Sequence, residues 1–322
     1  MNTSELREGL EARQVWIYFA AVIVAAAIGL LIPGTAVLES AINPALALML
    51  FVTFLQVPVA ALGRALQELR FVGALLAVNF IAVPLLVLGL VQFLPADPLI
   101  RLGVLMVLLC PCIDYVVTFA HLGRADARLL LASTPVLLIA QMALLPIYLR
   151  LFLGAEAAAY VQPGPFIHAF VWLIAIPFVL AALVQPWAAR SKMGERVSSG
   201  LGLAPVPATA LVLFIVVAAV MPQLGQTLDR TLSVVPVYVA FAVLAPLIGW
   251  AGSRLARLTP EAGRAVAFSA GTRNSLVVLP LALVVPGAIP LVPAIIVTQT
   301  LIELLAELVY IRCIPRLGRR SI

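Results

Sequence analysis

Charged residues are scarce in this sequence. Only 11% of its 322 residues are Asp, Glu, Lys or Arg, and 64% are hydrophobic. A soluble domain carries about 25% charged residues, so this chain lacks the polar side chains needed to cover a water-facing surface. The formal net charge of +6 does not indicate a nucleic-acid partner, because the basic residues lie in short loops between long apolar segments. The composition therefore predicts a protein embedded in a lipid bilayer.

Cysteines and known catalytic motifs are also few. The three cysteines are Cys110, Cys112 and Cys313, and an odd number that lies mostly inside apolar segments argues against a disulfide framework. Neither a Gly-x-Ser-x-Gly nor a His-Glu-x-x-His motif occurs, so the catalytic groups of an intramembrane enzyme are missing. The loops are too short for a sensor domain. We therefore expect no enzyme, no cofactor and no receptor-like sensor.

Long apolar runs, in contrast, recur from end to end. A helix that crosses a bilayer needs about 20 mostly apolar residues. The first run ends at Pro33-Gly34 without a small-residue cleavage site, so we interpret it as a helix rather than a signal peptide. The runs are too long and continuous for barrel strands, which predicts an all-helical membrane protein. Ten spans are predicted, numbered here in chain order: 16–32, 43–61, 71–94, 100–121, 129–153, 166–187, 203–221, 233–253, 264–286 and 291–313.

The positive charges test this number of spans. Cytoplasmic loops are enriched in Lys and Arg, and a miscounted span would reverse the side of every later loop. With the N-terminus in the cytoplasm, only Arg101, Arg150 and Arg230 fall on the outer side, and Arg273 falls inside a span. We therefore predict a multi-pass protein of the cell membrane with both termini in the cytoplasm. The other 16 of the 20 basic residues fall on the cytoplasmic side: Arg7, Arg13, Arg64, Arg70, Arg124, Arg128, Arg190, Lys192, Arg196, Arg254, Arg257, Arg264, Arg312, Arg316, Arg319 and Arg320.

Ten spans divide into two sets of five, at residues 1–154 and 155–322. Because five is odd, the second set enters the membrane from the opposite side, which is the arrangement of inverted-repeat transporters. The predicted architecture is therefore a single transmembrane unit of two inverted five-helix repeats. A weak correspondence between spans five and ten agrees with it, because each places a Gln six residues after a Pro: Pro135 and Gln141, and Pro293 and Gln299.

Spans four and nine are interrupted. In span four, Pro111 removes a backbone donor and disfavours helix in the residue before it, and Asp114 follows three residues later. In matching positions of two repeats, such interruptions are the best sequence indicator of a transport site, because half-helix ends offer free N–H and C=O groups to a ligand. We expect the two breaks to cross near the middle of the membrane. In span nine the apolar run stops at Gly271 and four polar residues follow: Thr272, Arg273, Asn274 and Ser275.

The charges inside these spans favour function over packing. A charged side chain at the centre of the bilayer costs about 2.5–3.5 kcal/mol or more, so Asp114 and Arg273 are predicted to pair. This pair is either structural or active in transport, and the alternative for the breaks themselves is a kink and a packing motif. In span ten, Glu303 is a candidate partner of Arg273 or a proton-carrying carboxyl, and Asp114 is the other candidate for the proton. Glu307, one helical turn later, is expected to extend toward Arg312.

Other polar residues inside the spans have two open interpretations. Asn79, Gln141 and Gln299 form either a helix–helix hydrogen bond or a contact with a substrate. His121 is interpreted as a boundary residue at the cytoplasmic end of span four.

Cys110 and Cys112 bracket Pro111. If the backbone is extended here, both thiols face one side. Thiolates bind soft ions, a class to which trivalent arsenic and antimony belong. The alternative is that each cysteine serves as a small apolar residue. Zinc is not expected, because no further Cys or His ligand lies within reach.

The two interrupted segments resemble those of a known family. The segment from Pro111 to Asp126 resembles the span-four motif of bacterial and fungal arsenite efflux permeases, which has Pro-Cys, a hydrophobic half-helix and an Arg-Gly-Asp-like turn. The segment from Phe268 to Asn274 resembles the polar break in span nine of the same family. These permeases belong to the superfamily of the bile acid:sodium symporters, which has ten helices in two inverted repeats, a panel and a core domain, and crossing spans four and nine. The likeness in topology covers the whole chain, and the motifs cover only these two spans.

The resemblance implies proton-coupled export of arsenite or antimonite. The functionally required cysteine of the family falls on Cys112, the predicted metalloid ligand, and Cys110 would assist it. Asp114 or Glu303 would exchange the proton. The hydroxyls of the metalloid would be bonded by three residues of span nine: Thr272, Asn274 and Ser275.

This sequence departs from its relatives at three positions. The span-nine acidic residue of the arsenite permeases falls near Leu276, and the sodium-site acidic residue of the bile-acid branch falls near Ser269, so neither is a carboxylate here. Arg273 stands where the relatives carry an amide. A fixed guanidinium can replace a bound cation, which makes sodium a less expected coupling ion than the proton. The alternative function is an organic-anion symporter of the bile-acid type, in which Arg273 holds the carboxylate of a small organic anion.

Overall fold

The protein is helical throughout the part of the chain that the computed structural model describes, residues 3–56, 68–113, 115–154, 163–224 and 227–318. Within these ranges, eight stretches of helix are long and apolar enough to cross a membrane. Large apolar side chains on their outer faces are exposed, among them Trp16, Ile23 and Leu183, as expected for surfaces that contact lipid. The prediction of an all-helical, multi-pass membrane protein is confirmed. The eight stretches coincide with predicted spans one, two, three, five, six, seven, eight and ten: α1 (Thr3–Leu31), α2 (Glu39–Phe54), α4–η3–α5 (Leu69–Val91), α8 (Ala127–Leu153), α10–η5–α11 (Pro163–Arg190), α13 (Pro205–Leu224), α14 (Leu228–Leu232) with α15 (Val235–Leu255), and α18 (Leu291–Cys313).

Predicted spans four and nine are each made of two short helices. Span four consists of α6 (Pro98–Leu108) and α7 (Tyr115–Leu122), and span nine of α16 (Pro260–Gly271) and α17 (Ser275–Leu283). Both breaks fall where the sequence placed them, at Pro111 and at the polar run after Gly271. The interruption of these two spans is therefore confirmed.

Two spans have other bounds than predicted. Helix α1 begins at Thr3 rather than at residue 16, because its polar first turns continue the same helix beyond the apolar run. Helix α2 ends at Phe54, whereas the prediction extended to residue 61. Residues 57–67 lie outside the described part of the chain.

The chain divides into two compact units. The first unit comprises residues 1–56, 161–229 and 279–297, and the second comprises 57–160, 230–278 and 298–322. Each unit takes spans from both halves of the sequence. The division into two inverted repeats at residues 154 and 155 stays a prediction.

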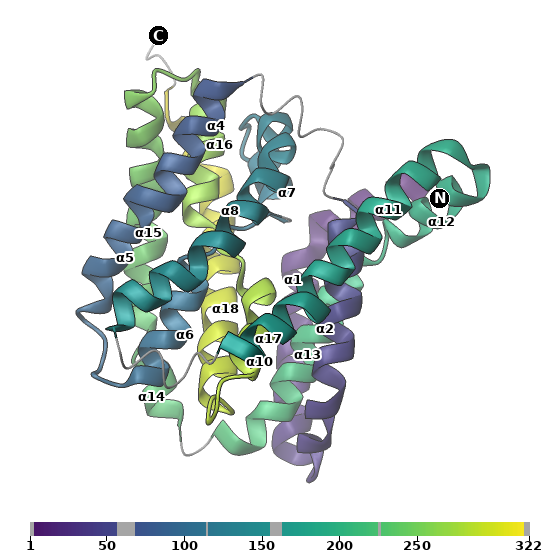
Figure 1. The fold of residues 1–322 in the computed structure, drawn as a ribbon, viewed down its shortest axis with the longest axis vertical. Coiled ribbons are helices and arrows are strands. Elements are labelled where there is room, and N and C mark those ends of the chain that lie inside the picture. Colours follow the sequence, from purple (N-terminus) through teal and green to yellow (C-terminus); the bar gives the residue numbers. More distant parts are fainter. Residues whose placement is uncertain (1–2, 57–67, 114, 155–162, 225–226, 319–322) are drawn as a thin grey trace. The chain divides into compact units, whose positions relative to one another are not determined.

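In the first unit, α1 packs along α13, and α2 packs against α13 and α11 (Figure 1). The approach of α1 to α13 depends on Gly29, where a Cβ atom would lie 2.8 Å from the Cβ of Met221. A short amphipathic helix, α12 (Lys192–Leu201), follows α11 and is capped at its N-terminus by Ser191. Small residues at close contacts are the usual means of packing helices in membranes.

In the second unit, α15 packs along α16, and α16 also contacts α7 and α8. The contact with α15 depends on Gly249, where a Cβ atom would lie 2.7 Å from the Cβ of Ala270 and 2.8 Å from the Cα of Ala267. The buried Arg264 of α16 fixes the turn between α7 and α8, because its Nη1 donates to the carbonyl of Arg124 at 3.1 Å. These contacts hold α16 against α15 and against the turn between α7 and α8.

Short hydrogen-bonding residues set the starts of the helices that carry the breaks. Asp97 accepts hydrogen bonds from the amides of Leu99 and Ile100 at the start of α6, and Thr259 accepts one from the amide of Ala262 at the start of α16. Such caps satisfy amide groups that have no partner within the helix.

A π-helical turn interrupts two of the spans. Segment η3 (Val78–Ala82) precedes Pro84, and η5 (Val171–Ala175) precedes Pro177. A proline inside an α-helix clashes with the carbonyl four residues earlier, and a wider turn before it relieves that clash. Turns of this kind often occur at functional sites, and η3 carries Asn79, whose contacts are described below.

Candidate functional site

The two breaks cross in the second unit. Pro111 and Arg273 form an antiparallel bridge. The amide of Cys112 donates to the carbonyl of Thr272 at 3.0 Å, and the amide of Asn274 donates to the carbonyl of Cys110 at 2.7 Å. These bonds replace helical bonds that the breaks remove, so the irregular backbone stays satisfied inside protein. The predicted crossing of spans four and nine is confirmed.

Arg273 lies at the centre of this crossing and is fully buried. Its Nη2 donates to Asn79 Oδ1 at 2.8 Å and to the carbonyls of Ser269 and Ala270 at 2.6 and 2.7 Å. Its Nη1 donates to the carbonyl of Leu108 at 3.3 Å. The three carbonyls belong to the last turns of α16 and α6, which are the negative ends of the helix dipoles. The guanidinium is thus a resident cation in a cage of protein oxygens.

Asn79 links this cage to η3. Its Oδ1 accepts the hydrogen bond from Arg273, while its Nδ2 donates to Ser269 Oγ and to the carbonyl of Leu75, each at 3.0 Å. Of the two interpretations from sequence, the helix–helix hydrogen bond is therefore the one observed.

Glu303 of α18 is the acidic partner of the crossing. It is 2% exposed and accepts three hydrogen bonds, from Tyr115 Oη at 2.5 Å, from the backbone amide of Arg273 at 2.6 Å and from Gln299 Nε2 at 2.6 Å. Gln299 in turn accepts a hydrogen bond from the Ser275 hydroxyl. Glu303 was predicted as a partner of Arg273 or a proton-carrying carboxyl. Tyr115 was not predicted, although an aromatic hydroxyl at the edge of a polar break was a usable signal.

Glu307 also faces the crossing. It is fully buried, and its Oε1 lies 2.5 Å from the hydroxyl of Thr272. The expectation that it extends toward the exposed Arg312 was wrong. Glu303 and Glu307 are four residues apart and share one face of α18, so the packing that directs the first toward the crossing directs the second there too.

Two buried polar side chains, one in the break of span nine and one in α8, keep unused hydrogen-bonding groups. Asn274 Nδ2, and both Nε2 and Oε1 of Gln141, lack a hydrogen-bond partner among the described residues. Buried groups of this kind are rare in folded proteins, and a ligand, ion or water that bonds to them is one explanation. By contrast, the hydroxyls of Thr272 and Ser275, which were also predicted to bond a substrate, are engaged within the protein. His121 lies exposed at the end of α7, as the boundary interpretation predicts.

The side chains of Cys110 and Cys112 are fully buried, whereas Cys313 is exposed. The bridge makes the backbone extended around Pro111, which is the condition under which both thiols face one side of the segment. Asp114 lies outside the described residues, so its pairing with Arg273 stays a prediction.

A small internal cavity adjoins this site. It has a volume of about 10 Å³ and is lined by residues that include Gln299 and Glu303 of α18 and Tyr238 and Phe241 of α15. Space of this size suits about one water molecule.

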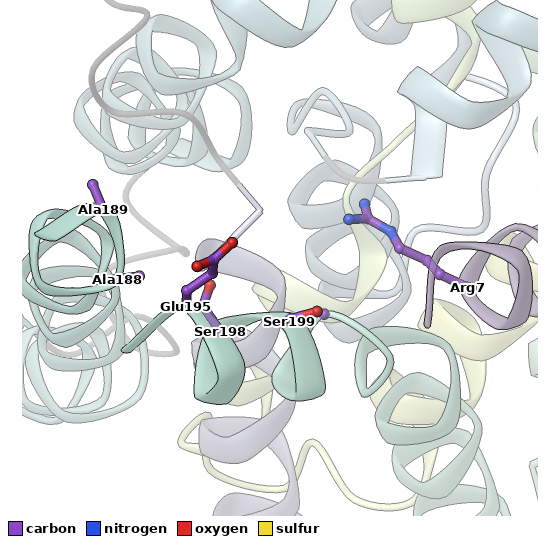
Figure 2. Close-up of a pocket in the computed structure, with 7 residues that line it drawn as sticks. Arg7, Ala188, Ala189, Glu195, Ser198 and Ser199 are labelled. Atoms are coloured by element: carbon purple, nitrogen blue, oxygen red, sulfur yellow. The ribbon is translucent and has the colours of Figure 1, made fainter. Parts of the chain in front are cut away.

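A larger pocket of about 640 Å³ lies in the first unit. Arg7 of α1 and Glu195 of α12 extend into it from different helices, with Ser198 and Ser199 beside Glu195 (Figure 2). Arg7 also pairs with Glu11 at 2.7 Å. None of the site residues predicted from the sequence lines this pocket.

A comparison with known protein families points to a transporter, as the two crossing broken helices do. The model of the Sodium Bile acid symporter family matches residues 43–230, which is more than half of the chain. The match includes the break of span four and ends before that of span nine. A search of curated proteins finds no match. With its multi-pass helical fold, the chain is a membrane transporter that belongs to the Sodium Bile acid symporter family.

Proposed function

We propose that the protein is a secondary transporter that exports trivalent arsenic or antimony and couples this export to protons. The observation that carries the proposal is the placement of two buried thiols, Cys110 and Cys112, on either side of the bridged Pro111. Thiol ligands select soft metalloids over hard cations. A pair of thiols inside the crossing of a transporter is better suited to such a cargo than to a bulky apolar one.

The chemistry of binding follows from the groups present. Arsenite and antimonite are neutral trihydroxides near neutral pH. When a thiol binds, one As–S bond forms and one As–O bond breaks, and the hydroxyl leaves as water together with the proton of the thiol. The unused Nδ2 of Asn274 is available to donate to a remaining hydroxyl. Because both thiols are buried, the crossing opens to water at one stage of the cycle.

Arg273 supports a coupling ion other than sodium. Four protein oxygens surround its guanidinium, an arrangement that satisfies a cation. This cation is part of the chain and does not exchange with the solution. The ion whose gradient drives transport therefore binds to another group, and the buried carboxyls of α18 are able to bind protons.

An organic-anion symporter is the second candidate, because the family match favours it. In that function Arg273 would hold the carboxylate of the anion. The four hydrogen bonds that its Nη atoms already make weigh against this role, since only Nε lacks a partner in the described part of the chain. The two candidates differ in what they require: anion transport requires Arg273 and tolerates loss of the cysteines, whereas metalloid transport requires Cys112.

The test is the resistance of an efflux-deficient bacterium to arsenite. We expect Cys112→Ser to lower the protection by about tenfold, equal to about 1.4 kcal/mol of binding, with a smaller effect from Cys110→Ser. Cys313→Ser is the matched control, because this cysteine is exposed and should leave protection unchanged. Full protection by Cys112→Ser would rule out the thiol role. Flux into proteoliposomes under pH or sodium gradients then identifies the coupling ion.

A further inference from the structure

The two carboxyls of α18 have different hydrogen-bond environments. Two of the three contacts to Glu303 come from groups that can only donate, a backbone amide and a side-chain amide. The third is the Tyr115 hydroxyl, which lies 2.5 Å from Glu303 Oε1 and 3.3 Å from the carbonyl of Arg273, so its single proton is directed to the nearer carboxyl oxygen. An ionised carboxylate is the natural acceptor for three donors. Glu303 therefore has the surroundings of a charged group, and its negative charge balances that of Arg273.

Glu307 has the surroundings of a neutral group. The hydroxyl of Thr272 lies 2.7 Å from the carbonyl of Phe268 and 2.5 Å from Glu307 Oε1. A hydroxyl has one proton to donate, and a carbonyl only accepts. If Glu307 were ionised, the hydroxyl oxygen would face one of these two acceptors without a proton between them. A proton on Glu307 resolves the conflict, because the acid then donates to Thr272 and Thr272 donates to Phe268.

Two further observations agree. Glu307 Oε2 has no hydrogen-bond partner among the described residues, and a buried carboxylate oxygen without a donor is costly. Among the described residues at the crossing, the charges also balance in this way: Arg273 and Glu303 cancel, and a second ionised carboxyl would add a net negative charge. No second buried cation is needed if Glu307 is neutral.

We propose that Glu307 is the group that binds and releases the transported proton, and that Glu303 stays ionised as the counter-charge of Arg273. This inference rests on the proton coupling proposed above and assigns it to a residue that sequence analysis did not choose. The loss of this proton also affects the crossing of spans four and nine. When Glu307 loses its proton, the Thr272 hydroxyl turns to donate to it and leaves the carbonyl of Phe268, while the carbonyl of the same Thr272 accepts from the amide of Cys112. Proton release thereby loosens the segment that carries the thiol.

The ionisable groups around Glu303 and Glu307 come from several elements. Glu303 and Tyr310 lie on α18 itself, and electrostatic interactions link Tyr310 to both Glu307 and Glu303. Arg273 follows the end of α16, and from α15 Tyr238 lines the cavity beside Glu303. Of these, only Arg273 is positive, and it is already balanced.

The first experiment is infrared spectroscopy of the purified, membrane-reconstituted protein. We expect a carbonyl band of a protonated buried carboxylic acid that is present in the wild type, absent in Glu307→Gln and shifted in frequency in Thr272→Val. Gln at position 307 can donate to Thr272 as the acid does, so this variant should fold. Persistence of the band in Glu307→Gln would overturn the assignment, and so would a spectrum of Thr272→Val identical to that of the wild type.

The second experiment is transport of arsenite in proteoliposomes. We expect Glu307→Gln to lose at least about tenfold of the accumulation that a pH gradient drives, equal to about 1.4 kcal/mol. Equal gradient dependence in variant and wild type would refute the role of Glu307. If the wild type moves no arsenite or antimonite, the proposed function fails, whereas the infrared band still decides the protonation of Glu307.

Discussion

The two units of this protein bury different kinds of polar group. In the described part of the first unit, the buried polar side chains are uncharged, and Gln14, Thr53 and Thr209 are examples. The second unit contains every buried charged residue of the described chain: Arg264, Arg273, Glu303 and Glu307. Charge inside a membrane protein is costly and is kept where it has a function. We therefore expect the chemistry of transport in the second unit.

In the packing of their helices, the two units are alike. Gly29 brings α1 onto α13 in the first unit, and Gly249 brings α15 onto α16 in the second. Close contacts between small residues are sufficient to hold membrane helices together. The described part of the first unit packs in this way without buried charges, which the second unit has in addition.

The strongest test of this difference is removal of the resident cation. Arg273→Met leaves Glu303 buried without its counter-charge and several carbonyl groups without a donor, which should cost about 3–5 kcal/mol and abolish transport. Thermal unfolding of the purified protein in detergent measures the loss. The double variant Arg273→Met/Glu303→Gln removes both charges and should recover part of the stability. An unfolding temperature of Arg273→Met equal to that of the wild type would show that the cage does not depend on this charge.

A moderate and equal loss of stability is expected when the glycine contact of each unit is disturbed. Gly29→Ala and Gly249→Ala each introduce a Cβ atom within 2.8 Å of a neighbouring side chain, and such overpacking costs about 1–3 kcal/mol. The control is Gly73→Ala, since no atom lies within 4 Å of the added Cβ, and there alanine should stabilise the helix by up to about 1 kcal/mol. Unfolding temperatures that fall for one of the two contacts and not for the other would break the parallel.

The smallest loss of stability is expected when a surface charge of the first unit is removed. Arg7 is paired with Glu11, and the side chain of Arg7 is 45% exposed. Arg7→Gln should therefore change the free energy of unfolding by less than about 1 kcal/mol, since solvent and salt screen such pairs. A loss comparable to that of Arg273→Met in the same assay would mean that the first unit also depends on a charged centre.

The sequence was sufficient to predict the helical fold, the two breaks and their crossing. Pro111 and the polar run from Thr272 interrupt apolar segments at matching positions of the two halves, a pattern typical of discontinuous transport helices. It was not sufficient to predict contacts that depend on the rotation of each helix. Glu307 was assigned to the surface because Arg312 is close in sequence, and Tyr115 was not considered because its partner Glu303 is 188 residues away. The π-helical turn that carries Asn79 was likewise not predicted. Pro84, two residues beyond it, indicates a disturbed helix but does not specify a π-helical turn.

The attachment of Arg273 to the backbone has an electrical consequence. A transporter that uses a dissolved cation at this position moves that charge across the membrane with its cargo, whereas here the positive charge remains in the protein. If the cargo is neutral and one proton moves in exchange, each cycle transfers one elementary charge. The membrane potential then contributes about 2.3 kcal/mol per 100 mV to the driving force. Export would accordingly generate a current, and it would slow when the membrane is depolarised.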